Sequence, residues 1–428
     1  MASVVTAFCP GTVSAREPEP SGLQQRINAA AEQAVDKVIA WRRDIHEHPE
    51  LGNRETRTAA LVAEHLRSLG IETRTEVAHT GVVGVLRGNR DKPVIALRAD
   101  MDALPVTEAT GLPFASKVRT EYNGEEVGVM HACGHDCHTA MLMGVAEVLA
   151  GMREKLPGTV LFIFQPAEEG SPAGESGGAG LMLREGAFNN PVPDAVLGQH
   201  ITTDYEAGTI AYRPKGTMAS VNGLRIVVRG TQTHGAYPWR GADPIVSAAQ
   251  IILGLQTIVS RQVDLTTAPA VVTIGMIDGG IRSNIIPAEV TMIGTIRTLD
   301  TDMQADIHDR IRTTAEKIAE SSGTTAEVTI SGSLPVTYND PALTDRMLPV
   351  LEQITGRDGL VLCNPHTGGE DFALYAQRVP GLFVFVGVRP AGSEIVPLHS
   401  PKIVVDEAGL VYGVRALAQM AAAYMEGE

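Results

Sequence analysis

The sequence predicts an α/β protein in which a mainly parallel-sheet domain is interrupted by an inserted ferredoxin-like α+β domain. Three observations support this fold class. The chain has 428 residues, more than one hydrophobic core ordinarily holds. Apolar strand-like runs alternate with helical periodicity toward both ends of the chain, which is typical of a parallel sheet. The middle of the chain instead follows the order β-α-β-β-α-β of the ferredoxin-like unit.

Helices and strands alternate through the first half of the chain. Helical spacing of apolar residues predicts helices over residues 30–46 and 55–69, and Gly70 follows the second at a position that tolerates a left-handed turn. Strand-like runs follow at residues 81–86, 93–97, 159–164 and 195–197, and a helix is predicted over residues 141–152. This alternation predicts a mainly parallel sheet with helices on both faces.

The inserted unit is predicted from a change of pattern near residue 220. Strands are expected at residues 220–228, 270–276, 289–297 and 326–330, and helices at 244–261 and 301–321. Helices at 341–354, 371–377 and 407–425 and a strand at 382–388 then resume the first pattern. We therefore expect one domain built from residues 1–217 and 334–428, with residues 218–333 inserted into it.

Composition excludes several classes of function. Hydrophobic residues make up 44% of the chain and charged residues 20%, as in a globular protein. The net charge of −15, without a basic patch, argues against a nucleic-acid partner. No run approaches the roughly 20 apolar residues that span a bilayer, so no membrane association is expected.

The N-terminus and the cysteines favour a cytoplasmic location. Residues 1–15 carry no Lys or Arg before their apolar part, and Pro10-Gly11 interrupts it, so a secretory signal is not expected. Residues 17–21 are predicted to be a flexible lead-in. Four cysteines in a chain of this size do not form a disulfide framework, and this fits a reducing cytoplasm.

Five short segments carry candidate chemistry, each just after a predicted strand or beside a helix start, where ligands bind in open α/β sheets. The first contains Asp100 and Asp102. Two carboxylates so spaced can serve a metal site, one by ligation and one by orienting a neighbouring ligand. By itself, this pattern fits an aspartate-rich turn better than a metal site.

The second segment, residues 131–138, holds three histidines and two cysteines within eight residues. Thiolate, imidazole and carboxylate are the ligands of zinc and related metals. A structural zinc knuckle usually needs a second paired-ligand motif, and the sequence contains no CxxC-type partner. The segment therefore predicts a metal site, but it leaves open which of the five residues bind.

The remaining segments supply carboxylates and two more imidazoles. Glu168 and Glu169 follow an apolar strand, and adjacent side chains diverge, so one is expected to bind metal and the other to face substrate. His200 and His399 are individually weak indications, because a lone histidine is more often structural. Together the five segments provide ligands for two cations and one spare carboxylate, which is what metal-assisted amide hydrolysis needs.

The motifs resemble those of the dinuclear metallo-aminoacylase and carboxypeptidase family. The closest resemblance is to the branch of hippurate hydrolase, N-acyl-amino-acid amidohydrolases and plant auxin-conjugate hydrolases. The matching motifs, in family order, are RADMDALP, HACGHDCHTA, QPAEEG, GQH, GTQTHGAYPWRGADP, RSNIIPAE, GGEDFA and LHSP. The resemblance implies a small-molecule N-acyl amino acid substrate, N-acetyl, N-benzoyl or aryl-acyl, that is cleaved to a carboxylic acid and a free amino acid.

The resemblance implies roles for individual residues. Glu168 matches the catalytic base, and Asp102 matches an aspartate that orients a metal-binding side chain. The implied metal ligands are Cys133, His135, Glu169, His200 and His399. Two divalent ions per subunit are expected, Zn²⁺ or Mn²⁺, with Co²⁺ or Ni²⁺ also compatible. Most other branches have histidine at position 100 and a bridging aspartate at position 135; this departure leaves the metal and any ligation by Asp100 open.

In the inserted domain, His234 matches a histidine that stabilises the tetrahedral oxyanion. Asn284 and Arg297 match positions associated with the product's carboxylate, although Arg297 equally fits an exposed strand residue. Glu370 lies in a rim motif and is expected to support the metal shell. In related enzymes this domain is a lid and dimerisation domain, so a homo-oligomer is expected, and His234 acts either within its own chain or across a dimer.

Two other functions compete with the amidohydrolase. A non-catalytic, metal-stabilised relative would keep the fold, but Glu168 and the full ligand set argue against it. A peptidase acting on dipeptides is disfavoured by the cysteine-containing motif. The sequence does not choose among acetyl, benzoyl and indole acyl groups.

Overall fold

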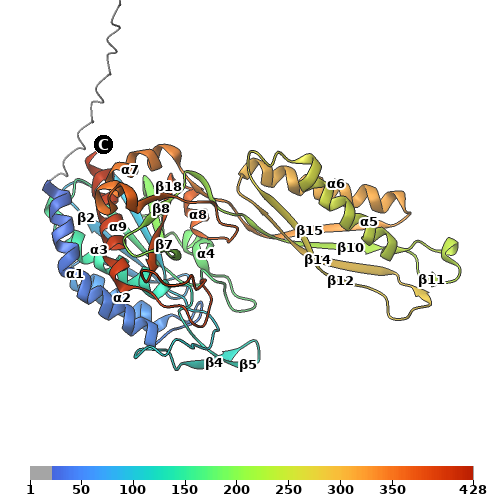
Figure 1. The fold of residues 1–428 in the computed structure, drawn as a ribbon, viewed down its shortest axis with the longest axis horizontal. Helices are drawn as coiled ribbons and strands as arrows, with labels where there is room; N and C mark the ends of the chain where they lie inside the picture. The colour runs from blue at the N-terminus through green and yellow to red at the C-terminus, as the bar shows by residue number, and fades with distance from the viewer. Residues whose placement is uncertain (1–21, 428) are drawn as a thin grey trace, which may run out of the picture.

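The computed structural model describes residues 22–427, which form two lobes (Figure 1). The second lobe consists of residues 221–334, and the first lobe contains the rest of the described chain. The predictions about a secretory signal, the lead-in at residues 17–21 and Cys9 fall outside the described residues. The inserted α+β unit of the predicted fold class is confirmed, whereas the exact domain boundaries stay a prediction.

An eight-stranded, mostly parallel sheet forms the centre of the first lobe. Its strands, in spatial order, are β1 (Glu72–Val77), β2 (Gly81–Arg87), β6 (Thr159–Gln165), β3 (Val94–Asp100), β7 (Ala195–Glu206), β18 (Gly381–Arg389), β8 (Ile210–Tyr212) and β17 (Leu360–Leu362). The central pairs β6–β3, β3–β7 and β7–β18 are parallel. The carboxyl ends of β3, β6 and β7 therefore meet at one edge.

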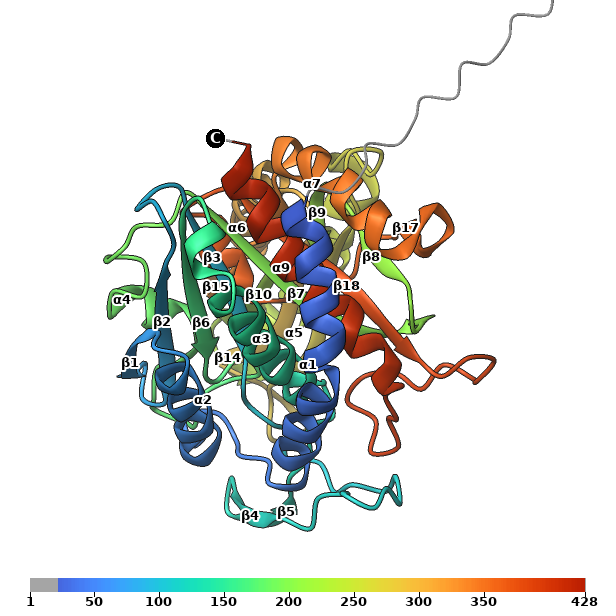
Figure 2. The same cartoon turned by 90° about the vertical axis from the view of Figure 1, so that its left-hand side faces the viewer.

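Helices cover both faces of this sheet, as expected for buried parallel strands. One face packs against α1 (Gly22–Glu47), α2 (Thr56–Ser68), α3 (His135–Ala150), α7 (Pro341–Thr355) and α9 (Leu410–Glu426). Figure 2 shows α1, α2 and α3 in front of the sheet. The other face carries the shorter helices α4 (Gly178–Arg184) and α8 (Phe372–Ala376). The helix α3 is buried along almost its whole length, so its first turn is held rigidly.

The second lobe is a four-stranded antiparallel sheet with two helices on one face. The strands, in spatial order, are β12 (Ala270–Asp278), β14 (Glu289–Thr298), β10 (Val221–Arg229) and β15 (Thr325–Leu334), and α5 (Pro244–Thr257) and α6 (Thr301–Ser321) cover them. The small strands β11 (Thr233–His234) and β13 (Ile285–Ile286) pair at the end remote from the first lobe. This is the predicted ferredoxin-like unit.

One segment of the described chain, Pro244–Gln262, has the length and apolar composition of a membrane span. It comprises α5 and a π-helical turn, Ile258–Gln262. Ile251, Leu255 and Ile258 are buried in the core of the second lobe. The apolar character is therefore partly explained by packing against the sheet, as in the core helix of any folded domain.

Some elements differ from their predicted extents. The strand predicted at residues 195–197 continues to Glu206, because β18 pairs along its length beyond the end of β3. The helix predicted at residues 141–152 begins at His135. The strand β1 was not predicted, since its residues, ETRTEV, are polar at the sheet edge. The hairpin of β4 (Arg119–Tyr122) and β5 (Glu125–Gly128) was also missed, because it is largely exposed.

Candidate metal centre

The five predicted metal ligands lie together at the carboxyl edge of the large sheet. Their ligand atoms fall into overlapping groups in which all atoms lie within 4.8 Å of one another. These groups are Cys133–His135–His200, Cys133–Glu169–His399 and His135–Glu168–Glu169. We call the five residues Cys133, His135, Glu169, His200 and His399 the ligand cluster. The loop after β6 supplies Glu169, β7 supplies His200, the turn into α3 supplies Cys133 and His135, and the loop before α9 supplies His399.

Unusual backbone conformations hold these residues in place. Ala167, directly before Glu168, has a φ of 51°, and His399 has a φ of 67°. Gly134 has a φ of 90°, and a Cβ there would lie 2.2 Å from Ile201 Cδ1. Left-handed conformations are costly for residues other than glycine and concentrate at functional sites. The chain therefore accepts local strain where the ligand cluster is assembled.

Hydrogen bonds orient two of the imidazoles, so that a defined ring nitrogen of each one faces the ligand cluster. His135 Nδ1 lies 3.1 Å from Asp102 Oδ1, and His200 Nδ1 donates to the Ile201 carbonyl at 2.6 Å. Because a carbonyl oxygen only accepts, His200 Nδ1 carries a proton, and His135 Nδ1 faces the Asp102 carboxylate, so the Nε2 atom of each ring is turned toward the ligand cluster. His135 Nε2 is buried and has no hydrogen-bond partner among residues 22–427. Such orientation of ligand imidazoles is typical of metal sites.

The donor set fits divalent metal. His399 Nε2 lies 3.2 Å from Cys133 Sγ and 3.0 Å from Glu169 Oε1, and His200 Nε2 lies 3.4 Å from the same sulfur. Burial raises the pKa of the Cys133 thiol well above its usual value, so the metal-free thiol is neutral. A bound cation reverses this, because a coordinating thiol is deprotonated. Nitrogen, oxygen and sulfur donors in one small volume suit zinc and its neighbours.

Asp100 and His138 form a further group of potential ligand atoms with His135, and both are hydrogen-bonded within the protein. Asp100 Oδ1 lies 2.6 Å from His138 Nδ1, and Asp100 Oδ2 accepts from Arg98 Nη1 at 2.6 Å. His138 Nε2 accepts from the Ile201 amide at 2.8 Å. Both nitrogens of His138 and both oxygens of Asp100 are thus engaged within the protein. Asp100 consequently acts as a hydrogen-bond acceptor beneath the ligand cluster.

The other two members of the 131–138 motif point elsewhere. Cys137 belongs to the hydrophobic core around α3. The His131 ring lies 6.4 Å from the His46 ring, and burial lowers the pKa of His131 to about 3. His131 is therefore a neutral core residue. Of the five candidates in this motif, only Cys133 and His135 join the ligand cluster, and they do so from the turn that begins α3.

Sequence reasoning missed the buried cation beneath the cluster. Arg98 is 1% exposed and forms ion pairs with Asp100, Glu370 and Asp371 at 2.6, 3.0 and 2.9 Å. Its Nε also donates to Gln165 Oε1 at 3.0 Å. The only sequence indication was an arginine directly after an apolar strand. Arg98 neutralises carboxylates that would otherwise repel one another in a buried site.

Glu168 lies between the ligand cluster and this carboxylate group. Its Oε2 is 4.0 Å from His135 Nε2, and it groups with Glu370 and Asp371. Burial, followed by the negative charges of Glu370 and Asp371, raises the pKa of Glu168 well above its usual value. Glu169 diverges from it toward His399. A carboxyl group with a raised pKa beside metal ligands is suited to exchange protons near neutral pH.

The three predicted residues of the second lobe do not reach the ligand cluster in this conformation. His234 lies on β11, at the tip remote from the first lobe (Figure 1), and is exposed. Asn284 lies beside it, since its carbonyl accepts from the Gly235 amide at 2.8 Å. Arg297 lies near the opposite end of β14 and donates to the Ile296 carbonyl at 2.9 Å. Their predicted roles stay predictions.

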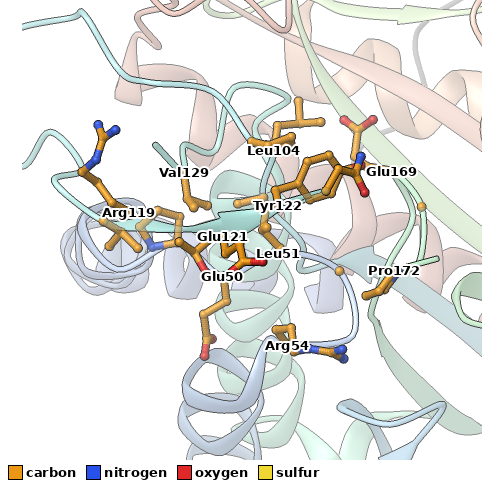
Figure 3. Close-up of a pocket in the computed structure, with 18 of the residues that line it drawn as sticks. Glu50, Leu51, Arg54, Leu104, Arg119, Glu121, Tyr122, Val129, Glu169 and Pro172 are labelled. Atoms are coloured by element: carbon orange, nitrogen blue, oxygen red, sulfur yellow. The ribbon is translucent and has the colours of Figure 1, made fainter. Parts of the chain in front are cut away.

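Two cavities adjoin the ligand cluster and share Glu169. The larger, of about 840 Å³, is also lined by Cys133, Glu168, His200 and His399. The other, of about 580 Å³, lies beside the hairpin β4–β5. In Figure 3, Glu169 lies at one end of this second cavity and Arg119 at the other. Both volumes are in the range of roughly 300–1,000 Å³ that is typical of small-molecule sites.

The fold and the site together define a metal-dependent hydrolase. The chain belongs to the Peptidase family M20/M25/M40, whose model matches residues 96–423. It is 40% identical over 402 residues to thermostable carboxypeptidase 2 from Saccharolobus solfataricus, covering 93% of this chain and 98% of that relative. It is 39% identical over 393 residues to N-acetylcysteine deacetylase from Bacillus subtilis, covering 91% of this chain and 97% of that relative.

A solved structure supports the same family. It is a Bacillus subtilis protein described as a dinuclear metal-binding peptidase of the M20 family, with a TM-score of 0.76 and 37% sequence identity. The match covers 92% of this chain and 99% of that structure. The predicted resemblance and the two-domain fold class are confirmed by these comparisons.

Proposed function

We propose that the protein hydrolyses the amide bond of N-acyl amino acids, releasing a carboxylic acid and a free amino acid. The observation that carries this proposal is Glu168, a carboxyl group with a raised pKa that faces the ligand cluster without being needed for it. The names of relatives support the reaction class, since one is an N-acetylcysteine deacetylase at 39% identity. The substrate is a small molecule.

The proposed cofactors are two divalent ions per subunit. They are Zn²⁺ or Mn²⁺, and Co²⁺ or Ni²⁺ are also compatible. Their ligands are Cys133, His135, Glu169, His200 and His399, and Asp102 orients the His135 ring through its Nδ1. When bound, the ions polarise the amide carbonyl and acidify the attacking water. Asp102 also accepts from the Glu169 amide at 2.9 Å, so one carboxylate orients two ligands.

Glu168 is the proposed general base and acid. It takes the proton of the attacking water and passes it to the leaving amine. Arg98 holds Glu370 and Asp371 beside it, so the negative charge that keeps the pKa of Glu168 high stays in place. Glu370 supports the site from this position and is not required as a ligand.

We propose that His234 and Asn284 act across a dimer. They lie at the tip of the second lobe, far from their own ligand cluster. Apolar side chains on β12 and β14 are exposed, including Met276 (65%) and Ile277 (55%), and such a patch is typical of a protein–protein contact. In a dimer, His234 would stabilise the oxyanion, and Asn284 and Arg297 would bind the carboxylate of the amino acid. The proposed compartment is the cytoplasm.

A carboxypeptidase is the second candidate function. It is favoured by the 40% identity to a relative named thermostable carboxypeptidase 2. The two functions share the ligand cluster and Glu168 and differ only in whether the acyl half is an amino acid. Comparing kcat/KM for N-acyl amino acids and for dipeptides with the same C-terminal residue separates them.

The test of the proposed mechanism is Glu168→Gln. Its kcat on the preferred N-acyl amino acid should fall at least ~10²-fold, as is usual when a general base is lost, while metal analysis still finds both ions. The neighbouring change Glu169→Gln should instead lower the metal content, because Glu169 belongs to the ligand cluster. Normal turnover by metal-replete Glu168→Gln protein would refute the assignment.

A further inference from the structure

The backbone on both sides of Glu168 is held by buried carboxylates. The Glu169 amide, directly after it, donates to Asp102 Oδ2 at 2.9 Å. The Ala167 amide, directly before it, donates to Glu55 Oε1 at 2.8 Å. The proposed function gives Asp102 a role, because it orients metal ligands. It gives none to Glu55, although Glu55 is 0% exposed and is bonded to the residue beside the proposed general base.

The side chain of Glu55 is not needed for the helix that it precedes. Glu55 stands at the N-cap of α2, but its side chain forms no capping hydrogen bond there. The amides at the start of a helix need an acceptor. In α2 this acceptor is Glu50, to which the amides of Arg57 and Thr58 donate, both at 2.9 Å. The carboxylate of Glu55 is therefore available for a contact outside the helix.

The carboxylate of Glu55 is hydrogen-bonded to neutral groups. Besides the backbone amide described above, Thr80 Oγ1 donates to Glu55 Oε2 at 2.5 Å. The neighbouring Arg54 is directed instead to Glu175, at 2.7 Å. Burying a carboxylate without a hydrogen-bonded cation is costly, and an apolar side chain would fill such a position at lower cost. The presence of a carboxylate here is thus explained by what it binds, which is the turn that carries the proposed base.

The turn has an unfavourable backbone conformation that this contact stabilises. Ala167 has a φ of 51°, in the left-handed region that is costly for residues other than glycine. A hydrogen bond to its amide offsets part of that cost. Close packing adds a second restraint, because a Cβ on Gly52 would lie 3.1 Å from Ala167 Cβ and 2.4 Å from the Gly170 carbonyl oxygen. The loop that contains Gly52 and Glu55 therefore holds this turn in place.

We propose that Glu55 is a positioning residue, which fixes the direction of the Glu168 carboxyl group through the Ala167 amide. The proposal rests on the function proposed above, in which Glu168 is the general base. Glu168 Oε2 lies 4.0 Å from His135 Nε2, so a small rotation of the turn changes its distance from the ligand cluster. Misplacing a reacting group by about 1 Å can lower the rate by roughly 10²-fold. The Glu55 carboxylate bonds to Thr80 and Ala167 and not to a metal ligand, so its loss should leave metal binding intact.

The test compares Glu55→Met with Glu55→Gln in metal-loaded enzyme. A thioether is only a weak acceptor, so Glu55→Met loses the bond to the Ala167 amide. Its kcat on the preferred N-acyl amino acid should fall roughly 10–10²-fold, while KM and metal content stay unchanged. Glutamine keeps an oxygen for the Ala167 amide, and its amino group can donate to the Thr80 hydroxyl, so Glu55→Gln should retain most of kcat. Hydrogen exchange of the peptide that contains Ala167, measured by mass spectrometry, should rise in Glu55→Met only.

Glu185→Met is the matched control. Glu185 Oε2 accepts from the Ala78 amide at 2.7 Å, and Ala78 also has a positive φ, of 55°. The same kind of bond is therefore lost, but the residue after Ala78 has no role in the proposed mechanism. The kcat of Glu185→Met should stay at the wild-type value. A loss as large as that in Glu55→Met would overturn the specific role of Glu55.

The variants separate the role of Glu55 from that of Glu168. Normal turnover by metal-replete Glu168→Gln protein would overturn both. Wild-type kcat in folded, metal-replete Glu55→Met protein, or an equal loss in Glu55→Gln, would overturn only the role of Glu55. If Glu55→Met does not fold by circular dichroism, Thr80→Val decides the question, because it removes the hydroxyl that holds the other oxygen of Glu55. A several-fold lower kcat at unchanged KM in that variant supports the role, and an unchanged kcat overturns it.

Discussion

The ligand cluster of the first lobe and His234 at the tip of the second lobe differ in burial and in hydrogen bonding. In the first lobe, His135 and Asp102 are buried and bonded to each other, and Arg98 neutralises the carboxylates beneath them. In the second lobe, His234 is exposed, and its Nδ1 accepts only from the nearby Ala236 amide, at 3.0 Å. The first arrangement is complete within one chain. The second leaves the imidazole of His234 exposed to solvent.

This difference indicates what positions the side chains of each region. Buried hydrogen bonds and ion pairs hold the ligand cluster before metal or substrate arrives, which is the condition for electrostatic catalysis. Among the described residues, His234 belongs to no such network, so its proposed action on the substrate requires domain closure or a partner subunit.

The largest effect is expected from Arg98→Met. Removing this cation leaves Asp100, Glu370 and Asp371 without their common partner in a buried site. Breaking a buried ion-pair network by removing one member typically costs about 3–5 kcal/mol. We expect a loss of that size in the free energy of unfolding, measured with urea, together with a lower metal content. An unchanged stability would mean that the first lobe does not depend on its buried network.

The second prediction concerns His234→Ala, which should lower kcat by roughly 10²–10³-fold, as is usual when an oxyanion donor is lost. KM should change little and the metal content should stay intact, because the residue is remote from the ligand cluster. Steady-state kinetics measures kcat and KM, and metal analysis measures the metal content. If His234 is only a polar turn residue before Pro238, activity will barely change.

Mixing variants distinguishes the two ways in which His234 could reach the site. Glu168→Gln and His234→Ala subunits are each expected to be inactive as homo-oligomers. A mixed dimer with a shared site contains one intact site, so mixing should restore part of the activity. No recovery in a preparation shown to exchange subunits would leave closure within one chain as the explanation, and the two lobes would then be less independent than this comparison implies.

The third prediction is that removing the metal affects hydrogen exchange in the first lobe more than in the second lobe. A ligand present at about one hundred times its dissociation constant stabilises the state that binds it by roughly 2.7 kcal/mol. Chelation should therefore increase hydrogen exchange in β7 and at the start of α3, which carry His200 and His135 of the ligand cluster. Exchange in β10 and β14 should change far less. Equal increases in both lobes, measured by mass spectrometry, would contradict the separation.

The sequence was sufficient to locate residues that follow apolar strand-like runs. Glu168, Glu169 and His200 follow apolar runs in strands β6 and β7, and the carboxyl edge of a parallel sheet brings such positions together. The fold class was predictable for the same reason, since the spacing of apolar residues changes from one unit to the next. Local pattern and topology therefore determine most of the ligand cluster.

Features that depend on distant partners were not predictable. The burial of Arg98 requires Glu370 and Asp371, which come from a different part of the chain. The hydrogen bonds of Asp100 were not predictable either, because they join it to His138 and Arg98 in the folded chain. The cavity of about 580 Å³ beside the hairpin β4–β5 was missed, because the strand β4 has no apolar alternation. Tertiary contacts determine all three features.

The smallest effect is expected from Arg310→Met, the counterpart of Arg98→Met in the second lobe. Arg310 lies on α6 and pairs with Asp306 one helical turn away at 2.6 Å, and its side chain is 37% exposed. Exposed pairs of this spacing contribute only about 0.3–0.5 kcal/mol and are screened by salt. Methionine also keeps a high helix propensity. We therefore expect a change below about 1 kcal/mol in the free energy of unfolding, which shrinks further in 0.5 M salt, roughly five times a common buffer concentration. Arg98→Met and Arg310→Met each remove one positive charge, the first from the first lobe and the second from the second lobe. Similar losses of unfolding free energy in both variants would refute the view that only the first lobe relies on buried electrostatics.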